Sequence, residues 1–434
     1  MSANLATKLS RAAEPAPDYI LGKRETLRVF TLLCLLMVFD FADRMIVASL
    51  LPIIKAEWQI TDAQSGLLST VLFVGMVVFA FPAVALTNRI GRIKTASLMG
   101  VFWSVASAAG AFAGNIGQLV ATRAAVGVGE AGYAPASYAW ITAVFPPRRR
   151  QLALGIFSSG QIIGMSLGVA LGGYIATHFG WRHALGLMAL PGLLVAVLLY
   201  RGRDYKTIPE ATATATAAPP QKPFKVILGS RALLWGYLSQ AMATLQWVPV
   251  FYFLPTYFHR IHGVPLQQAS YMASALLLLT IISVPAGGWI MDRWSVSAPQ
   301  RKLTFAAILG ALGTVAYAAA FGLIHDAKLQ YGVILVVFFL SGLGGVATLG
   351  MTQELVTPDV RPLAGTCGVI VLHFLGSAPG PYIAGLLSDR YGLTAALLIG
   401  VLVSGTLAVL TLLLARKHYL ADLAKVGAYK LAPA

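Results

Sequence analysis

Residues 201–225 read RGRDYKTIPEATATATAAPPQKPFK, a charged stretch rich in alanine, threonine and proline in an otherwise largely apolar chain. This composition is typical of a linker. Six apolar segments precede it, near residues 29–51, 64–87, 94–114, 117–144, 151–177 and 182–200. Six more follow it, near residues 230–258, 267–291, 303–324, 330–356, 363–387 and 393–415. Each can cross a hydrocarbon core of about 30 Å. The sequence therefore predicts an all-α membrane protein with 12 transmembrane helices in two groups of six.

The apolar segments and the linker divide the chain into five parts. We expect a cytoplasmic N-terminal tail at 1–28, a six-helix bundle at 29–200, a cytoplasmic linker at 201–229, a second six-helix bundle at 230–415 and a cytoplasmic C-terminal tail at 416–434.

Composition excludes several classes of function. Of the 434 residues, 57% are hydrophobic and 11% are charged, whereas a soluble domain has about a quarter charged. The net charge of +16 therefore has no soluble face on which to bind nucleic acid. Cys34 and Cys367 have no partners at metal or disulfide spacing, and no nucleophile–base pattern is present. We expect no enzyme, no metal and no cofactor.

Lysine and arginine set the predicted topology. With both tails and the linker inside, 25 of the 32 lie on the inner side of the membrane. The outer side has Lys55, Arg182, Arg260, Lys328 and Arg390. This asymmetry, with the lack of an N-x-S/T acceptor, predicts a multi-pass protein of a bacterial inner membrane with both termini in the cytoplasm. Its partners would be the lipid bilayer, a small substrate and protons, and we expect a monomer.

The two halves repeat one another. A shift of 212 residues places Arg149 on Arg361, Gly164 on Gly376 and Gly168 on Gly380. Parallel six-helix repeats are the architecture of the major facilitator transporters, which this chain resembles.

Two loops resemble the signature loop of that superfamily, G-x-x-x-D-R-x-G-R. In that loop, an acid caps a helix and pairs with arginine, which latches the two halves together. The copy between the second and third segments has Asn88, Arg89, Gly91 and Arg92. The copy between the eighth and ninth has Gly288, Asp292 and Arg293. The first copy has asparagine in place of the acid, which predicts a weak latch. The alternative is that both loops only set topology.

Small residues recur along the fifth segment, at Gly160, Gly164, Gly168 and Gly172. A four-residue spacing puts them on one ridge, where another helix can approach closely. Gly380 and Pro381 lie on the corresponding part of the eleventh segment. Both stretches predict helix packing.

Five ionisable residues fall at membrane depth: Asp40, Asp43 and Arg44 in the first segment, and Arg123 and Glu130 in the fourth. Charges there are costly and persist mainly for pairing or function. Asp40 and Arg44 are one helical turn apart and can pair. We expect all five to form one cluster.

The cluster has three carboxylates and two guanidiniums, so one acid lacks a cation and would take up a proton more easily than in water. The sequence therefore predicts proton coupling through Asp43, Glu130 or Asp40. Asp43 is favoured, because Asp40 has Arg44 one turn away and Glu130 can hold either arginine. A purely structural charge network is the alternative.

Softer signals come from four other side chains. His373, Gln161, Gln246 and Tyr252 lie in apolar helices and are predicted to contribute to substrate binding. Packing residues or an aromatic belt would look the same in sequence.

Three stretches narrow the resemblance within the superfamily: FADRMIVASLLPIIK, RAAVGVGEAGYAPA and LQWVPVFYFLPTYFHR. They resemble the Spinster branch, which implies alternating-access transport of amphiphilic lipids of the sphingolipid or lysophospholipid type. The resemblance also implies functional roles for Asp43, Arg44, Arg123, Glu130 and His373. A proton-coupled organic anion symporter is the alternative, because both arginines could bind a carboxylate. A membrane sensor that does not transport is a more remote one.

Overall fold

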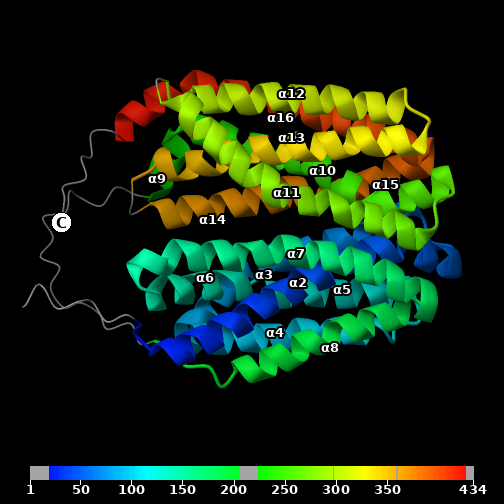
Figure 1. Cartoon of the computed structure of the whole chain (residues 1–434), viewed down its shortest axis with the longest axis horizontal. Coiled ribbons are helices and arrows are strands. Elements are labelled where there is room, and N and C mark those ends of the chain that lie inside the picture. The colour runs from blue at the N-terminus through cyan, green and yellow to red at the C-terminus, as the bar shows by residue number, and fades with distance from the viewer. Residues whose placement is uncertain (1–18, 206–222, 297, 358–359, 427–434) are drawn as a thin grey trace, which may run out of the picture.

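The computed structural model describes residues 19–205, 223–296, 298–357 and 360–426. Most of the expected N-terminal tail, the middle of the linker and the last part of the C-terminal tail lie outside these residues. Described helices form two bundles that lie side by side, the N-terminal one blue to green and the C-terminal one green to red (Figure 1).

Among the described residues, the N-terminal bundle contains α2 (Lys23–Trp58), α3 (Asp62–Ile90), α4 (Arg92–Gly110), α5 (Ile116–Glu130), α6 (Tyr133–Val144), α7 (Pro147–Phe179) and α8 (Trp181–Leu199). The C-terminal bundle contains α9 (Pro223–Gly229), α10 (Arg231–His262), α11 (Leu266–Ser295), α12 (Arg301–Gly322), α13 (Ala327–Glu354), α14 (Arg361–Leu372), the π-helix η1 (His373–Ser377), α15 (Pro379–Tyr391) and α16 (Leu393–Val426).

Eight stretches of the described chain are long and apolar enough to cross a membrane. They comprise α3, α7, α8, α11, α12, most of α13, the α14–α15 stretch and α16. The other four expected segments do not meet this criterion. α2, α4 and α10 are continuous helices that carry more polar residues, and the fourth segment is split into α5 and α6. The all-α arrangement in two bundles is that of the predicted fold, and the count of 12 is consistent with it.

Two of the predicted segments are not continuous α-helices. The fourth breaks at Ala131–Gly132, where Pro135 has no N–H to donate to the carbonyl of Ala131. The eleventh widens into η1, just before Pro379 and Pro381 remove two further donors. Prolines and glycines inside the apolar segments thus determine where the α-helix breaks or becomes a π-helix.

The helices also extend beyond the apolar runs. α2 begins at Lys23, within the expected N-terminal tail, and α9 lies within the expected linker. α16 continues to Val426, and its Asp422 accepts hydrogen bonds from the backbone N–H of Ala232 (2.9 Å) and from the Ser230 hydroxyl (3.1 Å). Part of the expected C-terminal tail is therefore a helix docked on α10.

We call the end of the bundles where the linker residues Tyr205 and Pro223 lie the linker end, and the opposite end the distal end. In the distal half one apolar core runs through both bundles and joins Leu51 and Ile54 to Phe253 and Phe258. Toward the linker end each bundle has its own core, with Ala378 at mid-length as the residue that crosses. The bundles are thus held together from mid-length to the distal end.

The glycine ridge on α7 brings that helix against α2. A Cβ atom at Gly164 would lie 2.3 Å from the Val38 carbonyl oxygen, and one at Gly168 would lie 2.2 Å from that of Ala42. In the second bundle η1 and α15 approach α10 in the same way, with Gly376 against Ala241. These glycines therefore lie where two helices approach closely, and their packing role stays a prediction.

Candidate functional site

The five ionisable residues predicted to cluster do meet, inside the N-terminal bundle. Asp40, Asp43 and Arg44 come from α2, while Arg123 and Glu130 come from α5. α2 is held in place by the glycine ridge of α7 behind it. The side chains are nearly inaccessible: Arg44, at 8% exposed, is the most open of them.

Arg44 is shared by two acids. Its Nη2 lies 2.9 Å from Glu130 Oε2 and 3.4 Å from Asp40 Oδ2. The guanidinium also lies over the ring of Phe41, at 4.2 Å from the centroid. Both Glu130 oxygens and Asp40 Oδ1 accept no hydrogen bond from the described residues. Arg44 and Glu130 are therefore close enough to form an ion pair, but their geometry is not that of a hydrogen bond.

Arg123 has one acid of its own. Its Nη1 lies 3.4 Å from both the carbonyl oxygen and Oδ2 of Asp43, and its Nη2 donates to the Ser107 hydroxyl at 2.9 Å. Ser107, on α4, in turn donates a short hydrogen bond to Asp43 Oδ1. Sequence reasoning missed Ser107, because a neutral serine in an apolar helix gives no signal of charge pairing.

These contacts locate the excess carboxylate. Asp43 has Arg123 and Ser107, whereas Asp40 and Glu130 divide a single guanidinium. A buried carboxylate without a full partner is costly, and one proton on either acid would balance the Arg44 group.

His373 and Tyr252 lie at the boundary between the bundles. The His373 ring, in η1, stacks on Phe73 of α3 at 5.2 Å, and its Nδ1 is 3.1 Å from the Ser377 hydroxyl. The Tyr252 hydroxyl of α10 donates to the Ser65 carbonyl of α3 at 3.1 Å. Both side chains therefore contact the opposite bundle.

The two predicted glutamine sites lie elsewhere. Gln161 donates to the Tyr138 hydroxyl at 3.4 Å, within the N-terminal bundle. Gln246 donates to Thr314 Oγ1 (3.0 Å) and to the Val401 carbonyl (3.2 Å), inside the C-terminal bundle. The structure does not bring either glutamine to the charged cluster, and their predicted role in binding stays a prediction.

The signature loops contact residues that the sequence did not suggest. Asn88 and Arg89 are exposed, whereas Asp204 caps the start of α4 by accepting from the backbone N–H groups of Arg92 (2.5 Å) and Ile93 (3.2 Å). Arg92 stacks on Tyr205 at 4.4 Å. The superfamily signature has an acid where this chain has Asn88, and here the capping carboxylate comes from Asp204 at the start of the expected linker.

The second loop forms a local stack. Arg293 lies over the Trp289 ring at 4.4 Å, while Asp292 is exposed. Gly288 has open space where a Cβ would be. These contacts stay within the C-terminal bundle, and the latch role of both loops stays a prediction.

A salt bridge between the bundles lies at the distal end instead. Asp62, at the start of α3, accepts two hydrogen bonds from Arg260 of α10, at 2.7 and 2.8 Å. It also accepts from Lys55 (2.6 Å) and from the Ser388 hydroxyl of α15 (2.6 Å). Asp389 of α15 caps α3 by accepting from the N–H groups of Asp62 and Ala63, at 2.7 and 2.9 Å. We call Asp62 and Arg260 the distal bridge.

Nothing in the sequence pairs the residues of the distal bridge. The Thr61–Gln64 capping box marks the start of a helix, and Lys55 and Arg260 stand out only as exceptions to the charge asymmetry.

The chain is similar to known membrane transporters. The Major Facilitator Superfamily matches residues 33–366. The hexuronate transporter of Bacillus subtilis is 26% identical and aligns with 85% of this chain and 89% of its own length. The "Probable sphingolipid transporter spinster homolog 1" of Arabidopsis thaliana is 24% identical, over 84% of this chain and 83% of its own. The crystal structure of a bacterial homologue of the human lysosomal transporter Spinster, inward-facing and unoccupied, has a TM-score of 0.77 at 20% identity, over 95% of this chain and 100% of its own.

Proposed function

The chain belongs to the major facilitator superfamily, and from that premise we propose that it is a proton-coupled secondary transporter of amphiphilic, lipid-like substrates of the sphingolipid or lysophospholipid type. Transport would follow alternating access, in which the two bundles rock about the substrate. The linker end would face the cytoplasm of a bacterium and the distal end the outside. The observation that carries the proposal is the Arg44 group, with two carboxylates on one guanidinium.

Proton coupling follows from the charge of that group. With Asp40 and Glu130 both ionised, the Arg44 group has one net negative charge in a buried place. As the bundles rock, a shift of α2 against α5 within the N-terminal bundle would change which acid Arg44 contacts, and the released acid would bind a proton. We therefore assign the proton to Glu130 or Asp40. The sequence alone favoured Asp43, but Asp43 has the partners Arg123 and Ser107.

The amphiphilic class follows from the asymmetry of the bundles. Cations at mid-length come from the N-terminal bundle, whereas the described lysines and arginines of the C-terminal bundle lie toward its two ends. At mid-length α10 instead contributes Trp247 and Phe251, whose ring centroids are 6.5 Å apart. A substrate with a polar end and an apolar tail suits one charged and one apolar bundle.

The alternative substrate class is an organic anion, as the name of the hexuronate transporter relative indicates. For anion transport, Arg44 or Arg123 would have to release the acidic side chain that it contacts and bind a carboxylate of the substrate instead.

Ligand-dependent thermal stabilisation of the purified protein separates the two classes, because a ligand that binds only the folded state raises the unfolding temperature. We expect sphingosine or lysophosphatidylethanolamine to stabilise the protein and glucuronate to have no effect. Stabilisation by glucuronate alone would favour the anion symporter.

A further inference from the structure

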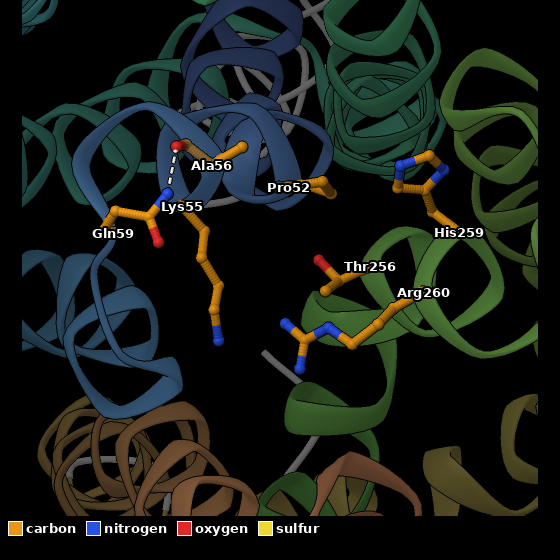
Figure 2. A pocket seen from close by; sticks show the side chains of 7 residues that line it. All are labelled: Pro52, Lys55, Ala56, Gln59, Thr256, His259 and Arg260. Carbon is orange, nitrogen blue, oxygen red and sulfur yellow. Dashed lines mark hydrogen bonds between the residues drawn. The ribbon is translucent and has the colours of Figure 1, made fainter.

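A cavity of about 340 Å³ opens at the distal end, between the bundles. Its walls are the last turns of α2 and α10, and they comprise Pro52, Lys55, Ala56, Gln59, Thr256, His259 and Arg260. Figure 2 shows Lys55 and Arg260 extending into the same opening from opposite sides. We call this cavity the distal vestibule. It lies over the distal bridge.

The cations around the distal vestibule do not each have a carboxylate partner of their own. Lys55 and Arg260 are both about one-third exposed and both contact Asp62. The second carboxylate nearby, Asp389, accepts from the backbone N–H groups at the start of α3. Two cations that face the vestibule therefore share one side-chain carboxylate.

Thr256 adds an unpaired donor. Its side chain is 3% exposed, and its hydroxyl has no hydrogen-bond partner among the described residues. Figure 2 shows that hydroxyl directed into the opening, beside Arg260. Buried polar groups are nearly always hydrogen-bonded, so an unpaired hydroxyl beside Arg260 indicates a place for an acceptor from outside the chain.

The other polar side chains of the wall are occupied. Gln59 donates to the Ala56 carbonyl at 2.8 Å, and His259 Nδ1 is 2.9 Å from the Val264 carbonyl oxygen. The charged side chains and the unpaired hydroxyl that face a ligand are those of Lys55, Arg260 and Thr256.

We propose that the distal vestibule binds an anionic oxygen group, a phosphate or carboxylate, through Thr256, Lys55 and Arg260, and that binding releases the distal bridge. The anion replaces Asp62 as the partner of both cations, and arginine binds such groups through paired hydrogen bonds. Asp62 then no longer holds α3 to α10. This inference rests on the proposed function, because the phosphate or carboxylate would be part of a substrate that passes through the distal end.

Distance measurement between spin labels at His178 on α7 and Gln268 on α11 reports whether the distal ends separate. Both sites are exposed and lie near the contact of Gly173 with Ser270, and Cys34→Ala with Cys367→Ala removes the native thiols. In phosphatidylcholine nanodiscs, inorganic phosphate should lengthen the distance, whereas chloride at equal ionic strength should not. Replacing part of the phosphatidylcholine by phosphatidylglycerol, without inorganic phosphate, tests whether a lipid headgroup is the source.

Two variants make the result specific. Thr256→Val keeps the shape of the side chain and should raise the phosphate concentration for half-maximal effect about tenfold, the loss of one hydrogen bond to a charged group. Asp62→Asn should lengthen the distance without any anion. Glu57→Gln is the matched control, since Glu57 pairs with Arg182 at 2.7 Å at the same end but within one bundle. It should behave as wild type.

Equal responses to phosphate and chloride, with no response to phosphatidylglycerol, would overturn the proposal. So would an unchanged midpoint in Thr256→Val, or an unchanged distance in Asp62→Asn. Since no proton gradient is present, these outcomes are independent of the proton coupling assigned to Glu130 or Asp40.

Discussion

Arg44 on α2 lies 2.9 Å from the carboxylate of Glu130, the last residue of α5, and the same guanidinium also contacts Asp40. The contact joins two helices at the point where the fourth segment breaks. One cation therefore serves two acids, and the three carboxylates of the cluster are not equivalent. Asp43 has Arg123 as its own partner, whereas Asp40 and Glu130 share Arg44.

Asp43→Asn should destabilise the protein more than Glu130→Gln or Asp40→Asn. Asp43 is the carboxylate partner of Arg123, whose side chain is 0% exposed, and a buried cation without its carboxylate costs about 3–5 kcal/mol. Removing Glu130 or Asp40 leaves Arg44 with the other acid. Unfolding in detergent, followed by temperature or denaturant, checks the order.

The double variant Asp40→Asn with Glu130→Gln is the control for this account. It leaves Arg44 with neither acid and should lose as much stability as Asp43→Asn. If Asp43→Asn is as stable as wild type, the division of partners between Arg123 and Arg44 is incorrect.

Gly168→Ala should destabilise the N-terminal bundle by about 1–3 kcal/mol, the usual cost of overpacking. The new Cβ would lie 2.2 Å from the Ala42 carbonyl oxygen, so α7 and α2 must separate. Gly155→Ala, on the same helix, meets nothing within 4 Å and serves as the control. It should be neutral or slightly stabilising. Thermal unfolding of the two variants gives the comparison, and equal midpoints would contradict the predicted ridge.

Asp204→Ala should cost about 1 kcal/mol, the typical loss of a helix N-cap. Asp204 accepts from the first N–H groups of α4, whereas Asn88 is exposed at the end of α3. Asn88→Ala should therefore leave the unfolding midpoint unchanged. If Asn88→Ala lowers the unfolding midpoint and Asp204→Ala does not, Asn88 and not Asp204 caps the helix.

Sequence patterns were sufficient for the fold because long apolar runs and repeated glycines are local signals. Gly168 could be assigned to a packing ridge from spacing alone. Two breaks were not foreseen, at Ala131–Gly132 and at His373–Ser377, because an apolar window does not register the N–H groups that prolines remove.

The site was predictable where charge is rare. Arg44, Arg123 and the three acids stand out in apolar helices, so the cluster could be expected. Which acid has which arginine depends on the rotation of α2 against α5, and that is set by packing. Ser107 and Asp204 give no signal of their own, because a serine and a loop acid are common in such positions.

The distal bridge could not be read from sequence at all. Asp62 and Arg260 lie in different halves of the repeat, and their contact depends on how the two bundles meet. In the sequence, Lys55 and Arg260 stood out only because few lysines and arginines are predicted on the outer side of the membrane.

The most direct test of proton-coupled amphiphile transport is uptake into proteoliposomes under an imposed pH gradient. The substrate is the amphiphile that most raises the unfolding temperature, and the proteins compared are wild type, Glu130→Gln and Asp40→Asn. We predict that the gradient accelerates wild-type uptake and that Glu130→Gln still exchanges substrate but ignores the gradient. If wild-type uptake does not respond to the gradient, or if Glu130→Gln and Asp40→Asn both respond as wild type does, the Arg44 group is not the site of proton coupling.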